Sequence, residues 1–137
     1  MTTKQFLPLP YGKDVYSELK DNGCYFVDKT PYLKELIDKD KSNVMLFTRP
    51  RRFGKTLFMS MVEYFLKINS ANPGDTILQQ KLFKDTKILE DREFCAKYMG
   101  QHPVICLTLK GVQGKTFKAA YYKLAEVVSA KANEYSF

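Results

Sequence analysis

The sequence lacks the features that would place the chain in a membrane, outside the cell or among metal-dependent proteins. No apolar run approaches the roughly 20 residues that cross a bilayer, and the N-terminus has no apolar signal core. The cysteines, Cys24, Cys95 and Cys106, show no C-x-x-C spacing, and His102 is the single histidine. These absences predict a cytoplasmic protein with reduced thiols, no membrane partner and no histidine-based metal site.

Acidic residues are fewer than basic ones, 15 against 22, so the formal net charge is +7 over 137 residues. An excess of positive charge favours polyanionic partners, either nucleotide phosphates or nucleic acid. The charge does not choose between them, because lysines on solvated helix faces are also common. The length suits one domain with a hydrophobic core. Residues 1–12 are predicted to form a loose arm and residues 13–137 the folded part.

Short apolar runs alternate with helical spacing and predict an α/β fold with a parallel sheet flanked by helices. The runs at residues 24–27, 44–48 and 103–109 are of strand length. The last two are continuously apolar, which favours strands covered on both faces. Thr30 and Pro31 are placed as the N-cap and first residue of a helix. The expected helices cover residues 13–23, 28–41, 55–68, parts of 76–100 and 117–132.

The tripeptide Gly-Lys-Thr occurs twice, at residues 54–56 and 114–116, each time between a predicted strand and a predicted helix. A phosphate-binding loop needs this context, because a helix N-terminus presents unpaired N–H groups and a positive dipole end. The general pattern G-x-x-x-x-G-K-[ST] fits neither turn, since Arg49 and Leu109 replace its first glycine. The second turn is shorter and has no arginine, so we expect a glycine turn that leads into a surface helix.

The chemistry of the first turn, R-P-R-R-F-G-K-T, suits a nucleotide phosphate. Gly54 lets the backbone approach an anion with a positive φ, Lys55 can reach the β and γ phosphates, and the Thr56 hydroxyl can coordinate Mg²⁺. Arginines in the turn add charge and bind phosphate oxygens well. A basic turn that docks nucleic acid or another anion is the alternative. The predicted cofactor-binding residues are Arg49, Pro50, Arg51, Arg52, Phe53, Gly54, Lys55 and Thr56, with Thr56 as the Mg²⁺ ligand.

The string R-P-R-R-F-G-K-[ST], with Y-F-V-D-K-T-P-Y-L before it, resembles the bacterial AAA-ATPase-like family. The later Leu82-Phe83 pair and the P-V-I-C-L run keep the same order, so the resemblance covers residues 11–109. It implies a P-loop NTPase that uses ATP and Mg²⁺, in which the replaced glycine is a family feature. It also implies a longer protein with a C-terminal domain that resembles PD-(D/E)XK nucleases. This chain would then be the incomplete N-terminal portion of the P-loop domain.

Hydrolysis of ATP needs an acidic residue at the end of another strand to hold Mg²⁺, and no apolar run here ends in one. Glu90 and Asp91 follow only two apolar residues, and the run at residues 103–109 is followed by lysine. We therefore expect an N-terminal fragment of a predicted ATPase that binds nucleotide weakly and hydrolyses it slowly or not at all. The sequence defines no catalytic residue.

Three alternatives stay open. Asp28 and Lys29 either lie near the nucleotide or form an exposed turn, and the sequence favours neither. The whole chain could instead be a basic nucleic-acid-binding module in which Arg51, Arg52 and surface lysines bind the phosphate backbone, and nucleic acid could also be a partner of the full-length protein. It could finally be an inert structural piece that forms oligomers through exposed sheet edges.

Overall fold

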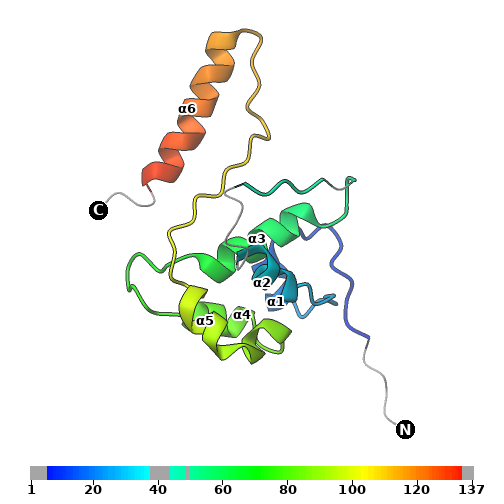
Figure 1. The fold of residues 1–137 in the computed structure, drawn as a ribbon. Coiled ribbons are helices and arrows are strands. Elements are labelled where there is room, and N and C mark those ends of the chain that lie inside the picture. The colour runs from blue at the N-terminus through cyan, green and yellow to red at the C-terminus, as the bar shows by residue number, and fades with distance from the viewer. Residues whose placement is uncertain (1–5, 38–43, 49, 134–137) are drawn as a thin grey trace. The chain divides into compact units, whose positions relative to one another are not determined.

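The structure, a computed structural model, describes residues 6–37, 44–48 and 50–133. The chain forms two compact units, Met1–His102 and Pro103–Phe137, and the regular structure of the described residues is helical (Figure 1). The second unit holds α6 (Phe117–Asn133). The first unit holds α1 (Tyr16–Asp21), α2 (Pro31–Ile37), α3 (Lys55–Leu66), α4 (Ile77–Leu82), the 3₁₀-helix η1 (Lys87–Glu90) and α5 (Arg92–Tyr98).

Several helices begin where the sequence predicts. α2 begins at Pro31, α3 at Lys55 and α6 at Phe117, which confirms these predicted starts. Thr30 precedes α2 as expected, but its hydroxyl accepts a hydrogen bond from Ile88 N at 3.2 Å rather than from the first turn of α2. Thr30 therefore ties α2 to η1, a contact between distant segments that local capping rules do not foresee.

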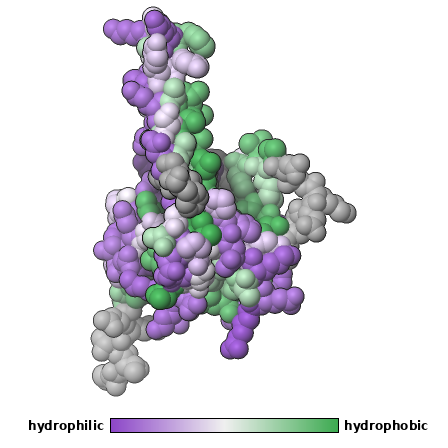
Figure 2. Space-filling model, turned by 90° about the vertical axis from the view of Figure 1, so that its left-hand side faces the viewer, coloured by the Kyte–Doolittle hydropathy of each residue, from purple (hydrophilic) through white to green (hydrophobic). Residues whose placement is uncertain are grey.

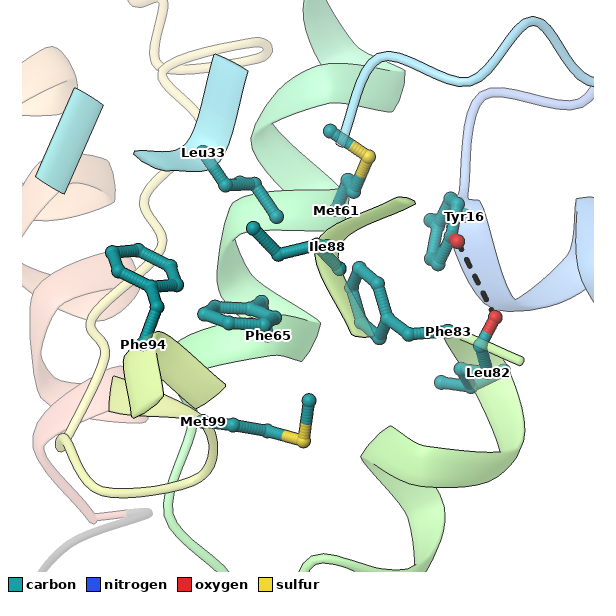
Figure 3. Packing of buried hydrophobic residues seen from close by; sticks show 9 residues of the cluster. All are labelled: Tyr16, Leu33, Met61, Phe65, Leu82, Phe83, Ile88, Phe94 and Met99. Carbon is teal, nitrogen blue, oxygen red and sulfur yellow. Dashed lines mark hydrogen bonds between the residues drawn. The ribbon is translucent and has the colours of Figure 1, made fainter. Parts of the chain in front are cut away.

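The hydrophobic core of the first unit is built around α3 (Figure 3). The fully buried Phe65 of α3 has its ring centroid 5.3 Å from that of Phe83 and 5.8 Å from that of Phe94. Aromatic and aliphatic side chains from the other helical elements of this unit surround these rings, and this packing fixes α3 in place. The buried cluster consists of Tyr16, Leu33, Met61, Phe65, Leu82, Phe83, Ile88, Phe94 and Met99.

Tyr16 connects α1 to the rest of the unit. Its hydroxyl donates to the Leu82 carbonyl oxygen at 3.3 Å (Figure 3), and its backbone N–H donates to Ser60 Oγ of α3 at 2.9 Å. Burial raises the pKa of the Tyr16 phenol, and the negative charge of Asp28 raises it further. The phenol therefore stays protonated and donates the hydrogen bond that holds α1 beside α4.

The predicted parallel sheet is wrong, because the residues that the structure describes contain no β-strand. Residues 44–48 and 103–109 run as irregular chain and belong to no β-strand (Figure 1), and one isolated parallel bridge joins Lys67 and His102. A continuous apolar run favours an extended backbone, but a sheet also requires a partner. A parallel partner is reached only through a crossover of about a dozen residues or more, so the pattern of one segment does not encode it.

The apolar side chains of these extended segments lie on the surface. Leu46 exposes 84% of its surface and Leu109 exposes 64%, and Figure 2 shows hydrophobic residues exposed among hydrophilic ones. Residues 24–27 are not a strand either, and Tyr25 N donates to the Pro8 carbonyl oxygen at 2.8 Å. The apolar residues on which the strand predictions were based therefore contribute little to the hydrophobic core.

The described residues of the second unit are all exposed or half-buried. No described residue of α6 is buried, and apolar side chains recur at helical spacing along it at Phe117, Tyr121, Leu124 and Val128.

Within the described parts of the chain, we find no helix with both the length and the apolar character needed to cross a bilayer.

Candidate phosphate-binding site

The turn before α3 has an unusual backbone. Residues 51–54 form a bend, and Gly54 is the N-cap of α3 with φ 72° and ψ 25°, in the left-handed region. Arg52 also has a positive φ of 67°, which is uncommon for a residue with a Cβ atom. Turns that contain left-handed residues direct successive N–H groups to one side, where they can bind an anion.

Four N–H groups around the start of α3 are not used by the residues that the structure describes. Phe58 N donates to the Gly54 carbonyl oxygen at 2.9 Å. The N–H groups of Phe53, Gly54, Thr56 and Leu57 donate no hydrogen bond to the residues that the structure describes. Gly54 makes no side-chain cap. This 12-residue helix therefore presents unpaired donors and the positive end of its dipole.

The Lys55 side chain folds back over the turn. Its Nζ donates to the Pro50 carbonyl oxygen at 2.9 Å, which brings the ammonium over the start of the same turn. An ammonium has three donors, so a lysine in this position can bind a phosphate oxygen as well as the carbonyl. The turn thus combines backbone N–H groups with a full positive charge.

The other predicted site residues that the structure describes lie in this turn or in the first turn of α3. Arg51, Arg52 and Phe53 are exposed. Thr56 lies exposed in the first turn of α3, and its hydroxyl makes no hydrogen bond to the described residues. Arg49 lies outside the described residues. The geometry is thus compatible with a ligand that approaches from solvent.

A lysine from another segment lies beside this turn. Lys29 Nζ is 3.8 Å from the position that a Cβ atom would occupy on Gly54. Lys29 is exposed and also lies beside the turn, so the structure agrees with both alternatives for this residue. The sequence motif around Lys29 suggested the residue, but its proximity to Gly54 brings together two distant segments and has no signal in the local sequence.

Asp28 anchors the backbone next to Lys29. Its Oδ1 accepts a hydrogen bond from Thr30 N and its Oδ2 accepts one from Lys87 N, each at 2.9 Å. Burial opposes ionisation of the carboxyl, but the hydrogen bonds from Lys87 and Thr30 and the charge of Lys87 outweigh burial and lower the pKa of Asp28. The carboxylate is therefore ionised at neutral pH and is engaged in holding the segment to η1.

Asp91, one of the two acids considered for metal binding, is engaged in contacts within the protein. Asp91 is the N-cap of α5, where its carboxylate accepts from Phe94 N at 3.1 Å, and it pairs with Lys34. The hydrogen bond from Lys34, supported by that from Phe94 N, lowers the pKa of Asp91. In the described ranges, no three His, Cys, Asp or Glu side chains gather as a metal site would require.

The second Gly-Lys-Thr turn has a different geometry. α6 begins at Phe117, directly after Thr116. Thr116 Oγ1 accepts a hydrogen bond from Ala119 N at 3.3 Å, and the Thr116 carbonyl oxygen accepts one from Ala120 N at 3.2 Å. A Cβ atom on Gly114 would lie 2.6 Å from Ala120 N. This turn packs onto its own helix, and its threonine occupies a donor that an anion would need.

A cavity of about 610 Å³ lies elsewhere in the first unit, with Arg92, Cys95 and Gln101 in its lining and no residue of the turn before α3. Burial raises the pKa of the Cys95 thiol, and the charge of Asp91 adds to this effect. The thiol is therefore protonated and lacks the low pKa of a reactive cysteine. None of the three cysteines forms a disulfide in the structure. The cavity shows no chemistry comparable to that of the turn.

Open N–H groups at a helix N-terminus, with a lysine folded over them, define a class of anion-binding turn that nucleotide-binding proteins use. The family model described as "Predicted AAA-ATPase" matches residues 10–137. The chain therefore belongs to this AAA-ATPase-like family, which indicates nucleotide binding in general. No curated protein and no solved structure matches the chain. The family resemblance is thus confirmed, while the role of the loop motif and the nuclease-like C-terminal domain stay predictions.

Proposed function

We propose that the chain binds the phosphates of a nucleoside triphosphate, ATP together with Mg²⁺, at residues 49–56. The observation that carries the proposal is the group of N–H donors at the start of α3 that no described residue uses, beside the Lys55 ammonium. Membership of the family supports nucleotide binding in general. The left-handed backbone at Gly54 supports this location for it.

Each group of the turn has its own role in this proposal. The N–H groups around Gly54 bind phosphate oxygens, and Lys55 neutralises the β and γ phosphates. The Thr56 hydroxyl is a ligand of the nucleotide-bound Mg²⁺. Arg51 and Arg52 are exposed and add forked donors that suit phosphate oxygens.

We propose further that the 137-residue chain hydrolyses ATP slowly or not at all. Efficient hydrolysis requires a second acidic residue at the metal ion. Asp91 is already engaged with Lys34 and the N-terminus of α5. A phosphate-release assay should give turnover well below about 1 per second or none, whereas turnover of about 1 per second or faster would contradict this part of the proposal.

Titration of the chain with a fluorescent ATP analogue tests the site. We expect saturable binding that ATP competes away, that Mg²⁺ strengthens and that Lys55→Ala weakens about 100-fold. Binding of nucleic acid would behave differently, since affinity would fall steeply with salt and each single charge removed would cost only a fraction of it. The absence of saturable binding of ATP to the wild-type chain would overturn the proposal.

A further inference from the structure

Lys29 is an exposed residue whose ammonium lies where the start of a helix favours an anion. Its ammonium lies beside Gly54 at the N-terminal end of α3. This end of a helix carries a partial positive charge and favours anions over cations. Among the described residues, no carboxylate forms an ion pair with Lys29, and its ammonium donates no hydrogen bond to them.

The backbone around Lys29 is held firmly on both sides. Asp28 accepts hydrogen bonds from Thr30 N and Lys87 N. Thr30 is fully buried, and its hydroxyl accepts from Ile88 N at 3.2 Å. These bonds tie the segment to η1 and so fix the backbone from which the Lys29 side chain extends.

We propose that Lys29 is a second phosphate-binding lysine, supplied from outside the loop, which contacts the phosphate chain of the nucleotide over Gly54. This inference rests on the proposed function, because it takes the bound anion to be a nucleotide polyphosphate. An anion held by the N–H groups around Gly54 supplies the negative charge that the Lys29 ammonium lacks. The contact with Lys29 adds affinity for nucleotides with several phosphates, since more negative charge then lies within its reach.

The test compares binding of the fluorescent ATP analogue by the wild-type chain, Lys29→Ala, Lys29→Arg and Lys84→Ala. Lys84 is an exposed lysine of the same unit, and its removal lowers the net charge by the same amount without touching the turn. Competition with ATP, ADP and AMP reports how the effect depends on phosphate number. Circular dichroism and thermal unfolding establish that each variant is folded like the wild type.

We expect Lys29→Ala to weaken binding of ATP about tenfold, to weaken binding of AMP less, and to leave the unfolding midpoint unchanged. Lys29→Arg should keep most of the affinity because it keeps the charge. Lys84→Ala should bind like the wild type. If Lys29→Ala binds ATP like Lys84→Ala, the inference fails while the proposed function stands. If the wild-type chain itself binds no nucleotide, both fail.

The same experiment separates a phosphate contact from a purely structural role. A structural lysine would lower stability when replaced, and its loss would weaken binding of ATP and AMP equally. A phosphate contact changes the ratio of the two affinities at constant stability. An equal loss for both nucleotides would overturn the inference.

Discussion

The turns before α3 and α6 share the tripeptide Gly-Lys-Thr but place it differently relative to the helix. Gly54 is the N-cap of α3, so the lysine and threonine that follow it lie inside the helix. α6 begins only after Thr116, so its glycine, lysine and threonine all lie outside. The two turns therefore use the same side chains for different purposes.

The difference shows that the position of the helix start decides what such a turn can do. In the first turn the glycine provides a left-handed backbone and no cap, and donors at the helix start stay unused by the described residues. In the second turn the Thr116 hydroxyl accepts the Ala119 N–H. The same three residues give a candidate anion site in one register and a capped helix in the other.

The largest expected difference between the turns is in nucleotide affinity. Lys55→Ala should weaken ATP binding about 100-fold, because it removes a charged donor to the phosphates. Lys115→Ala, the matched change in the second turn, should leave the affinity unchanged. Titration of both variants with the fluorescent ATP analogue measures this. Equal losses in the two variants would show that general positive charge, and not the turn before α3, attracts the nucleotide.

The glycines should respond to alanine for different reasons. Gly54→Ala should destabilise the first unit by about 1–2 kcal/mol, because alanine resists a left-handed backbone. Steric crowding adds nothing to this cost, since the nearest side chain, Lys29, leaves room for a Cβ atom. Gly114→Ala instead brings a Cβ atom to 2.6 Å from Ala120 N and should fray the start of α6. Hydrogen exchange read by mass spectrometry locates each effect. Faster exchange across α3 in Gly114→Ala would break the comparison.

The two threonines should affect different properties, Thr116 the stability of α6 and Thr56 the binding of ATP with Mg²⁺. Thr116→Ala should destabilise α6 by about 1 kcal/mol, since it removes a helix cap, and should not affect ATP binding. Thr56→Ala should leave stability unchanged and reduce the strengthening of ATP binding by Mg²⁺. Helical circular dichroism during thermal unfolding and titrations with and without Mg²⁺ measure both. The comparison loses its basis if Thr56→Ala lowers stability as Thr116→Ala does.

The smallest expected effect is on the dependence of stability on pH. The folded protein lowers the pKa of Asp28, so its ionised form stabilises the fold above the unfolded value of about 3.9 and this contribution is lost as the pH falls through the lower folded value. Asp28→Asn should therefore be less stable than the wild type near neutral pH, and the difference should shrink in acid. Thermal unfolding over a pH series measures this. A difference that stays constant into acid would contradict it.

The sequence predicts local features of this chain better than distant contacts. The starts of α2 and α3 follow from Pro31 and from the helical spacing after Lys55, which are properties of adjacent residues. The prediction of a sheet was wrong, because apolar residues at 44–48 and 103–109 favour an extended chain but do not indicate a partner strand. Two features of the turn could not be predicted from the spacing of residues in the sequence. These are the proximity of Lys29 to Gly54 and the positive φ of Arg52.

The division of the chain at Pro103 has a practical consequence. Every described side chain that is buried belongs to residues before this proline, and so do the turn before α3 and Lys29. A truncated chain that ends at His102 should therefore keep its interior and the turn before α3 together. It would also lose the exposed apolar residues 103–109, which makes it the better sample for crystallisation with ATP or for isotope-labelled NMR spectroscopy.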